Sequence, residues 1–551
     1  MTVSQLFNTQ TKTIAFAAGV LVLSSLVSRV LGVLRNGLLS WRFGAGETTD
    51  IYLAAFRVPD FLYGILITGG IAVVFLPVFS ELFQKDQKQA WLFVSNLLNV
   101  LLVSLLGFSV LIFLAAPFLI AVITPGFSAE QQVVTTNLTR LMLLSPILLG
   151  LSSLFSGVLQ YFGKFLAYSM APILYNVGII TGIVFLVPLF GIWGLGFGVA
   201  AGALLHLVVQ IPVVISSGFR WQPVFSWNDQ ALKKVRVLAF PRTIAATAFH
   251  INFIIMTAFA SVISIGSITI FNYANDIQQF SIGLIGGSFA VAAFPALSKF
   301  FAEQNISQFQ KAFGVTFRHI LFLVAPVVVF TFLLRAQIVR LIYGAGDLFT
   351  WNDTRLTAAA LGIFAFGVLF QAFIPFLTRA FFSMHNTKTP AIISVSSIAL
   401  NIALAFWFLD ILASPNMLTD FLVAMLKLQG IQDIRVLALP LALVVSGVFQ
   451  AKLLSLLLVK HMREVFQKEL YMSVGKTVFA TAVLGLVTYA ILQAYGGVFE
   501  LTTYKEVLGQ FVLASLGGSI AFVATAFLAR SPEIFSFWRI IRTRLTKKNF
   551  Q

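Results

Sequence analysis

Long apolar segments recur along the whole of this chain, with short polar connections between them. A helix of about twenty residues crosses the roughly 30 Å hydrocarbon core of a bilayer. Charged residues make up 10% of the 551 residues, whereas soluble domains carry about 25%. The sequence therefore predicts an all-α polytopic membrane protein with about fourteen transmembrane helices. These fall near residues 14–41, 51–82, 91–125, 134–161, 168–187, 191–217, 235–262, 268–300, 311–334, 357–383, 389–412, 434–459, 474–496 and 508–530.

Lysine and arginine are concentrated in alternate connections. With the N-terminus in the cytoplasm, roughly twenty of these residues fall inside and roughly seven outside, as the positive-inside rule requires. Both termini are therefore predicted to be cytoplasmic. This bias accounts for much of the net charge of +17, so the charge does not indicate a nucleic-acid partner. The first apolar segment lacks a small-residue cleavage site, which predicts an uncleaved anchor.

An internal repeat relates the two halves of the chain. Residues 64–82 (GILITGGIAVVFLPVFSEL) align without a gap to residues 282–300 (IGLIGGSFAVAAFPALSKF), so that Gly69 matches Gly287 and Pro77 matches Pro295. Parallel repeats of six helices are typical of transporters with a central cavity. The predicted organisation is an N-terminal lobe (1–217), a C-terminal lobe (218–465), two further helices (466–530) and a basic cytoplasmic tail (531–551).

Several kinds of catalysis lack the residues they need. There is no cysteine, the five histidines show no HxxxH or HExxH spacing, and no GxxxxGK[ST] phosphate loop occurs. No paired carboxylates and no Ser/His/Asp set emerge. The sequence therefore predicts a protein that is not an enzyme and needs no cofactor or metal.

Ionisable residues inside membrane spans indicate function by default, because burying charge in lipid is costly. On the first helix Arg29 and Asn36 share a strip with small residues, and Arg35 flanks it. The second helix carries Asp50 and Arg57 on one face.

Helix seven adds Arg242 and helix eight adds Asp276. Several arginines facing one cavity would suit a phosphate or diphosphate, since guanidinium binds such oxygens bidentately. Alternatively, these arginines reach the interface or form structural pairs with aspartates.

Glycines mark candidate hinges. Gly44 and Gly46 lie in a predicted turn at the outside end of the first helix, and Gly69 and Gly287 occupy matched positions of the repeat. Such residues allow close helix packing or bending in membranes.

The order of these motifs resembles the MurJ (MviN) family of lipid II flippases, within the multidrug/oligosaccharidyl-lipid/polysaccharide (MOP) exporter superfamily. The resemblance extends over essentially the whole chain. It is carried by Ser28-Arg29-Val30-Leu31-Gly32, Arg35, Phe43-Gly44-Ala45-Gly46, Asp50, Ala55-Phe56-Arg57-Val58-Pro59, Tyr273-Ala274, Phe294-Pro295-Ala296-Leu297-Ser298-Lys299 and Lys388-Thr389-Pro390.

The resemblance implies a function and its setting. An undecaprenyl-linked peptidoglycan precursor would cross a bacterial cytoplasmic membrane by alternating access between two lobes. Its diphosphate region would meet Arg29 and Arg35, and its prenyl tail would lie in a groove beside the last two helices. Membrane lipids and other cell-wall synthesis proteins are the further partners that the resemblance implies.

Departures from the family pattern leave alternatives open. Asn36 stands where the family commonly has an acid, Tyr63 and Thr68 replace a cavity arginine and a glutamate, and Asp276 stands where an arginine is expected. Either Arg242 supplies the missing charge, or the substrate is another lipid-linked saccharide. A third alternative is a cation-coupled exporter like those of the MATE family, for which Asp276 would be the coupling acid.

Overall fold

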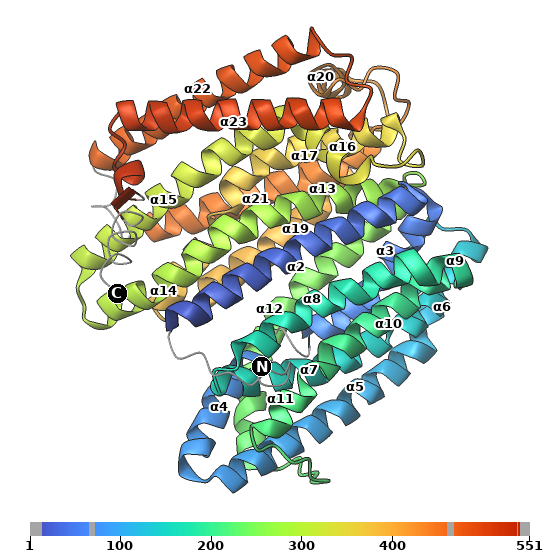
Figure 1. Cartoon of the computed structure of the whole chain (residues 1–551), viewed down its shortest axis with the longest axis vertical. Coiled ribbons are helices and arrows are strands. Elements are labelled where there is room, and N and C mark those ends of the chain that lie inside the picture. The colour runs from blue at the N-terminus through green and yellow to red at the C-terminus, as the bar shows by residue number, and fades with distance from the viewer. Residues whose placement is uncertain (1–13, 66–71, 460–467, 537, 540–551) are drawn as a thin grey trace. The chain divides into compact units, whose positions relative to one another are not determined.

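The computed structural model describes residues 14–65, 72–459, 468–536 and 538–539 (Figure 1). Within these ranges the chain forms helices and connecting turns and no strand, which confirms the predicted all-α class. Among the described residues, twelve helical segments, some of them made of two successive helices, are long and apolar enough to cross a membrane. The two other predicted spans, 51–82 and 235–262, are interrupted by residues or side chains that the structure leaves undescribed.

The chain divides into two compact units, and the first comprises Met1–Thr269 and Gly346–Leu348. Its helices are α2 (Ile14–Phe43), α3 (Glu47–Tyr63), α4 (Ala72–Lys85), α5 (Gln87–Ile123), α6 (Ala129–Met142), α7 (Leu144–Tyr161), α8 (Phe165–Thr181), the π-helix η2 (Gly182–Leu186), α9 (Val187–Phe190), α10 (Trp193–Val208), α11 (Ile211–Ser216) and α12 (Gln230–Ser261).

Glycines bring α8 and α10 into close contact in the first unit. Gly178 and Gly182 on one helix face Gly198 and Gly202 on the other. A Cβ on Gly178 would lie 2.3 Å from the Cα of Gly202. Small residues four apart let two membrane helices approach backbone to backbone. This contact fixes α8, and α8 in turn packs along α2, the helix that carries Arg29 and Arg35.

The second unit comprises Ile270–Ala345 and Phe349–Gln551. Its helices are α13 (Ser267–Ile282, whose first turn groups with the first unit), the π-helix η3 (Gly283–Gly287), α14 (Ser288–Ala302), α15 (Ile306–Leu333), α16 (Arg335–Tyr343), α17 (Trp351–Gln371), α18 (Ile374–Ser383), α19 (Lys388–Ile411), α20 (Met417–Leu426), the 3₁₀ turn η4 (Arg435–Leu437), α21 (Ala438–Val459), α22 (Lys468–Gly496) and α23 (Tyr504–Leu528).

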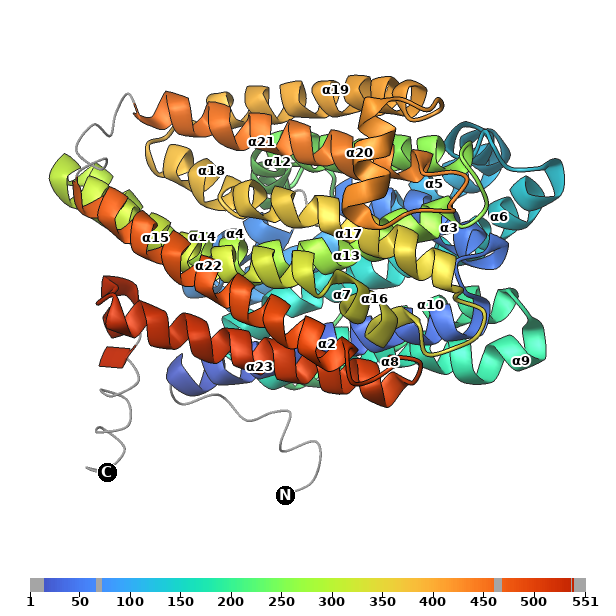
Figure 2. The same cartoon turned by 90° about the horizontal axis from the view of Figure 1, so that it is seen from above.

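The last two helices, α22 and α23, lie side by side and pack against α15 (Figures 1 and 2). Phe322 of α15 and Phe522 of α23 meet at 5.0 Å between ring centroids. Beyond the end of α23, the buried carboxylate of Glu533 accepts a hydrogen bond from Ser473 at 2.7 Å. The same carboxylate lies 3.7 Å from the Arg318 side chain. These contacts attach the C-terminal pair of helices firmly to the second unit.

Two predicted spans are divided in the structure. The segment 134–161 belongs to α6 and α7, which are separate helices, and the segment 357–383 belongs to α17 and α18. Pro146 and Pro375 occur within the first turn of the helix after each break, where a missing N–H does no harm. The short helix α20 was not predicted, because ten residues are too few to give a membrane-spanning signal.

The repeat has a structural counterpart. Residues 283–287 form the π-helix η3, and the aligned segment begins with π-helical residues at Gly64 and Ile65. Single π-turns inside helices often mark functional sites. The division into lobes at residue 217 stays a prediction, since the first compact unit continues through α12.

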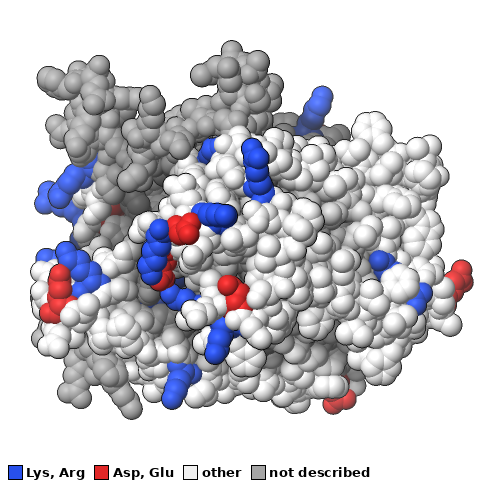
Figure 3. All heavy atoms as spheres, turned by 90° about the horizontal axis from the view of Figure 1, so that it is seen from below, with Lys and Arg blue, Asp and Glu red and all other residues white. Residues whose placement is uncertain are grey.

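Charged side chains are unevenly spread over the face drawn in Figure 3. On this face lysine, arginine and acidic side chains gather in clusters, and wide areas of surface carry no charged residue. Uncharged surface is what contact with lipid requires.

Candidate functional site

A polar seam joins α2 to α8 in the first unit. The Arg35 Nε donates a hydrogen bond to Asn36 Oδ1 at 3.0 Å, and Arg35 Nη1 lies 3.5 Å from Asn176 Oδ1. The Asn176 amide donates to the carbonyl oxygen and hydroxyl of Ser28, each at 3.3 Å. The predicted residues Arg35 and Asn36 are thus brought together, and α8 holds the guanidinium in position.

Asn176 is a site residue that the sequence analysis missed. It lies in the middle of an apolar span and is only 8% exposed. The rule that drew attention to intramembrane arginines applies also to a buried amide, so a search that included asparagine within apolar runs would have found it.

Arg29 lies one turn before Gly32 on the same helix, and its side chain is half-buried. The Gly32 position faces Asn176, because a Cβ there would lie 3.8 Å from Asn176 Oδ1. A small residue at this point lets α2 approach the polar group of α8.

Arg57 is positioned by α12. Its Nε donates to the buried Thr257 hydroxyl at 2.7 Å, and its guanidinium carbon lies 5.6 Å from the centroid of the Phe253 ring. The Thr257 hydroxyl in turn donates to the Phe253 carbonyl at 2.9 Å. Arg57 is therefore fixed by Thr257, which lies 200 positions further along the chain.

These hydrogen-bond partners of Arg35 and Arg57 are neutral oxygens. An amide or hydroxyl oxygen orients a guanidinium without cancelling its charge, whereas a carboxylate would do both. These contacts therefore orient the two guanidinium groups without themselves cancelling their charge.

Asp50 has a different environment. Its side chain is 3% exposed, and its carboxylate accepts hydrogen bonds from the Gly266 N–H at 2.6 Å, the Thr269 N–H at 2.8 Å and the Thr269 hydroxyl at 2.6 Å. This is the geometry of a cap at the start of a helix, where negative charge is stabilised by free N–H groups. Asp50 therefore ties α3 to the connection that follows α12. A substrate-binding role for Asp50 stays a prediction.

The predicted turn between α2 and α3 is confirmed at Gly44, which has a φ of +65°. A Cβ at Gly44 would come close to the Leu348 carbonyl oxygen, at 2.1 Å. Both the backbone conformation and the close approach therefore require glycine. Gly46 precedes the first turn of α3 with extended backbone, which any residue can adopt.

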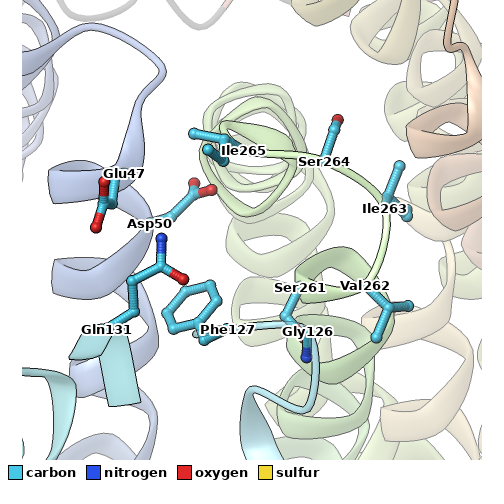
Figure 4. A pocket seen from close by; sticks show the side chains of 10 residues that line it. All are labelled: Glu47, Asp50, Gly126, Phe127, Gln131, Ser261, Val262, Ile263, Ser264 and Ile265. Carbon is cyan, nitrogen blue, oxygen red and sulfur yellow. The ribbon is translucent and has the colours of Figure 1, made fainter. Parts of the chain in front are cut away.

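A cavity of about 270 Å³ opens beside this turn (Figure 4). Its lining includes Glu47 and Asp50 from α3, Gln131 from α6 and residues 261–265. Of the predicted arginines whose side chains are described, Arg29, Arg35 and Arg57, none lines it. Because two carboxylates face this cavity, it does not fit a diphosphate.

In the second unit, the helix α13, which carries the predicted Asp276, has several polar side chains, and some of them are buried. Asn272 and Asn275 are buried, whereas the Asp276 side chain is exposed. Two residues after Asp276, the Gln278 side chain donates a hydrogen bond to Gln371 Oε1 on α17 at 2.8 Å. Asp276 thus presents its charge at the surface of this unit.

Gly287 has open space around it, since a Cβ at this position would have nothing within 4 Å. The neighbouring Gly286 differs, because a Cβ there would lie 2.1 Å from the Ala372 carbonyl oxygen. The predicted hinge residue is therefore free of close packing, and its neighbour is not.

Some predicted residues cannot be placed. Gly69 and Thr68 lie outside the described residues, as does the side chain of Arg242. Among the residues that are described, no group of three or more His, Cys, Asp or Glu side chains could hold a metal ion.

Lys164, in the connection before α8, is buried against α11 with its Nζ 3.0 Å from the Ser216 hydroxyl, and burial lowers the pKa of its ammonium.

The fold is shared with solved multi-pass membrane proteins that are described as a flippase and a transporter. A lipid II flippase MurJ in an inward closed conformation superposes with a TM-score of 0.73, at 21% identity over 93% of this chain and 98% of that one. An inward-facing MATE family transporter of the MOP superfamily gives a TM-score of 0.65, at 15% identity over 79% of this chain and 95% of that one. These likenesses show that the chain shares the fold of these two proteins.

Sequence similarity identifies the family. The family model described as lipid II flippase MurJ matches residues 39–508. A probable lipid II flippase MurJ of Buchnera aphidicola subsp. Acyrthosiphon pisum is 30% identical over 384 residues, which cover 69% of this chain and 75% of that protein. The chain belongs to the MurJ family.

Proposed function

We propose that this protein is a lipid II flippase. It moves the undecaprenyl-diphosphate-linked peptidoglycan precursor from the inner to the outer leaflet of a bacterial cytoplasmic membrane by alternating access. Support comes from the family match over residues 39–508 and from relatives named as lipid II flippases. The absence of a recognisable catalytic set in the sequence agrees with transport rather than chemistry.

One observation carries the proposal at the level of residues. Arg35 and Arg57 are held by amide and hydroxyl oxygens, and Arg29 lies on the same helix as Arg35. Arg35, which neutral amide oxygens orient, suits a diphosphate, whose oxygens accept bidentate hydrogen bonds from a guanidinium. In this proposal Arg29 and Arg35 bind the diphosphate region, and Arg57 adds to the positive potential.

The remaining predicted residues take supporting roles. Asp50 positions α3 through its helix cap, and Gly287 gives the π-helical segment of the second unit freedom to bend. The substrate's prenyl tail would lie against α22 and α23. Both chain ends lie in the cytoplasm, as the lysine and arginine bias predicts.

A second candidate function is favoured by Asp276. Its exposed carboxylate on α13 places negative charge where the family resemblance leads one to expect an arginine. A flippase for another lipid-linked saccharide would accommodate this difference, because the diphosphate–prenyl part is shared and only the attached group changes.

Reconstituted transport tests the proposal. Vesicles are prepared with the purified protein and fluorescent lipid II, and a membrane-impermeant quencher is added outside. Lipid II of the inner leaflet should become accessible to the quencher only when the protein is present. Arg35→Ala should abolish this movement, and Arg42→Ala, an exposed arginine on the same helix, should retain it. Movement of another lipid-linked saccharide but not of lipid II would favour the second candidate.

A further inference from the structure

The connection between α11 and α12 is fastened to the first part of α5. The Asn96 amide donates to the Ser226 carbonyl at 2.9 Å, and the Ser226 N–H donates to Asn96 Oδ1 at 2.7 Å. The Asn99 amide donates to the carbonyls of Gln222 at 3.0 Å and Val224 at 2.8 Å. Side-chain amides therefore satisfy the backbone groups of an extended loop and hold it in one conformation.

This fixed loop turns large aromatic side chains outward. Trp221, Phe225 and Trp227 are 59%, 55% and 49% exposed. Tryptophan exposed to this degree from an ordered loop is unusual on a surface that faces only water. Trp221 is also oriented, because its indole N–H donates to Asn99 Oδ1 at 2.8 Å.

Three cationic residues lie in this loop or in the first turns of α12. The Arg236 guanidinium lies 4.8 Å from the Trp227 ring centroid and donates to the Trp227 carbonyl at 2.8 Å. Arg220 and Lys233 are exposed. Within the described part of the chain, none of these three cations forms an ion pair, although the nearby Lys234 does so with Glu81. The loop and the first turns of α12 therefore present three cations outside any ion pair, next to the single carboxylate of Asp229, which caps α12.

The depth of the loop follows from α5. Exposed apolar side chains on this helix begin at Val103 and continue to Val122. Val103 and Val122 are nineteen positions apart, or roughly 29 Å along the helix axis, which matches the roughly 30 Å hydrocarbon core of a bilayer. Asn99 lies only about 6 Å before Val103 along the helix axis, so the loop bonded to it lies at the level of the lipid headgroups.

We propose that residues 219–227, which include Arg220, form an anchor together with Lys233 and Arg236. This anchor binds anionic phospholipid headgroups. The exposed aromatic rings insert at the interface, where aromatic belts are found in membrane proteins. The three cations attract anionic lipid electrostatically. The anchor holds the start of α12 at the membrane surface. In the orientation proposed above, these headgroups belong to the cytoplasmic leaflet. The anchor itself does not depend on that orientation.

Spin labelling tests the depth of this anchor. The chain contains no cysteine, so a nitroxide at Phe225→Cys reports from one position in vesicles of phosphatidylglycerol and phosphatidylcholine. The collision rates of this nitroxide with oxygen and with a water-soluble nickel complex should be intermediate. Val110→Cys in the apolar band gives the reference for lipid, and Asp86→Cys at the polar end of α5 gives the reference for water. Access to the nickel complex as high as that of Asp86→Cys would overturn the proposal and would leave a protein partner as the occupant.

A second measurement tests the choice of lipid. Native mass spectrometry should show that the protein retains phosphatidylglycerol in preference to phosphatidylcholine. The double variant Arg220→Gln/Lys233→Gln should lower this preference by about thirtyfold. The loop itself should keep its conformation, because neither side chain holds it. Arg42→Gln/Lys505→Gln removes two exposed charges elsewhere and should leave it unchanged. Equal preference in all three proteins would refute the anionic-lipid site. Both measurements are independent of transport, so they remain informative if the flippase proposal fails.

Discussion

At the scale of single residues, the account depends on how the arginines of the first unit are held. Asn176 orients Arg35 without neutralising it, and Thr257 does the same for Arg57. The difference between orienting and neutralising a cation can be tested by changing the partner and leaving the arginine in place.

Asn176→Asp should reduce substrate binding more strongly than Asn176→Ala. The aspartate would form an ion pair with Arg35 and cancel the charge that the diphosphate needs, whereas alanine only removes an orienting hydrogen bond. We expect a loss of about tenfold or more in affinity for the aspartate variant, corresponding to one charge-assisted hydrogen bond. Titration with lipid II in detergent measures it. An alanine variant that binds as weakly as the aspartate variant would mean that Asn176 acts only through packing.

Asp50→Asn should destabilise the protein by about 3 kcal/mol. The amide group would replace one acceptor oxygen of a buried carboxylate that accepts three hydrogen bonds, so the Gly266 N–H or the Thr269 groups would lose a partner. The midpoint of thermal unfolding in detergent measures the effect. Glu47→Gln, which alters an exposed carboxylate beside the same cavity, serves as the control and should change little.

At the scale of elements, the π-helical segment between α13 and α14 is the feature most closely linked to motion. It coincides with one member of the internal repeat, and π-helical residues also begin the described part of the other member. Two adjacent glycines in this segment differ in their surroundings, which allows packing and bending to be separated.

Gly286→Ala should lower the unfolding midpoint, because its methyl group would overlap the Ala372 carbonyl oxygen and force the backbones apart. Such overpacking typically destabilises by about 1–3 kcal/mol. Gly287→Ala meets nothing and should leave the midpoint unchanged. A transport defect in Gly287→Ala at normal stability would support its hinge role, and full transport would remove that role.

At the scale of the whole molecule, membrane orientation is the prediction with the widest consequences. Single cysteines at Asn228→Cys and Glu500→Cys can be compared in the cysteine-free chain. A membrane-impermeant maleimide should label the second variant in intact spheroplasts and the first only after permeabilisation, because the lysine-rich side faces the cytoplasm. The reverse pattern would invert the proposed direction of transport.

The sequence predicted the class of fold well, because apolar spans and their connections are local signals. The breaks at Leu143 and near Ala372 were not predicted, since each lies inside an uninterrupted apolar run. The short helix α20 carries too few residues for a span and also escaped prediction.

The site was predicted less completely. Arg35, Arg57 and Asp50 stood out as charges within spans, but their partners did not. Thr257, Asn176 and Gly266 lie 141 to 216 positions away in the chain, and such distant contacts leave no local pattern. The cap role of Asp50 in particular depends on N–H groups that only the fold brings to it.

Binding of lipid II measured by native mass spectrometry tests the central claim most directly. Lipid II would compete with undecaprenyl phosphate and another lipid-linked saccharide on the wild type, on Arg29→Ala and on the control Arg42→Ala, which changes an exposed arginine of the same helix. The account predicts preferential retention of lipid II by the wild type and the control, and its loss in Arg29→Ala. Equal retention of all three lipids, or unchanged preference in Arg29→Ala, would contradict it.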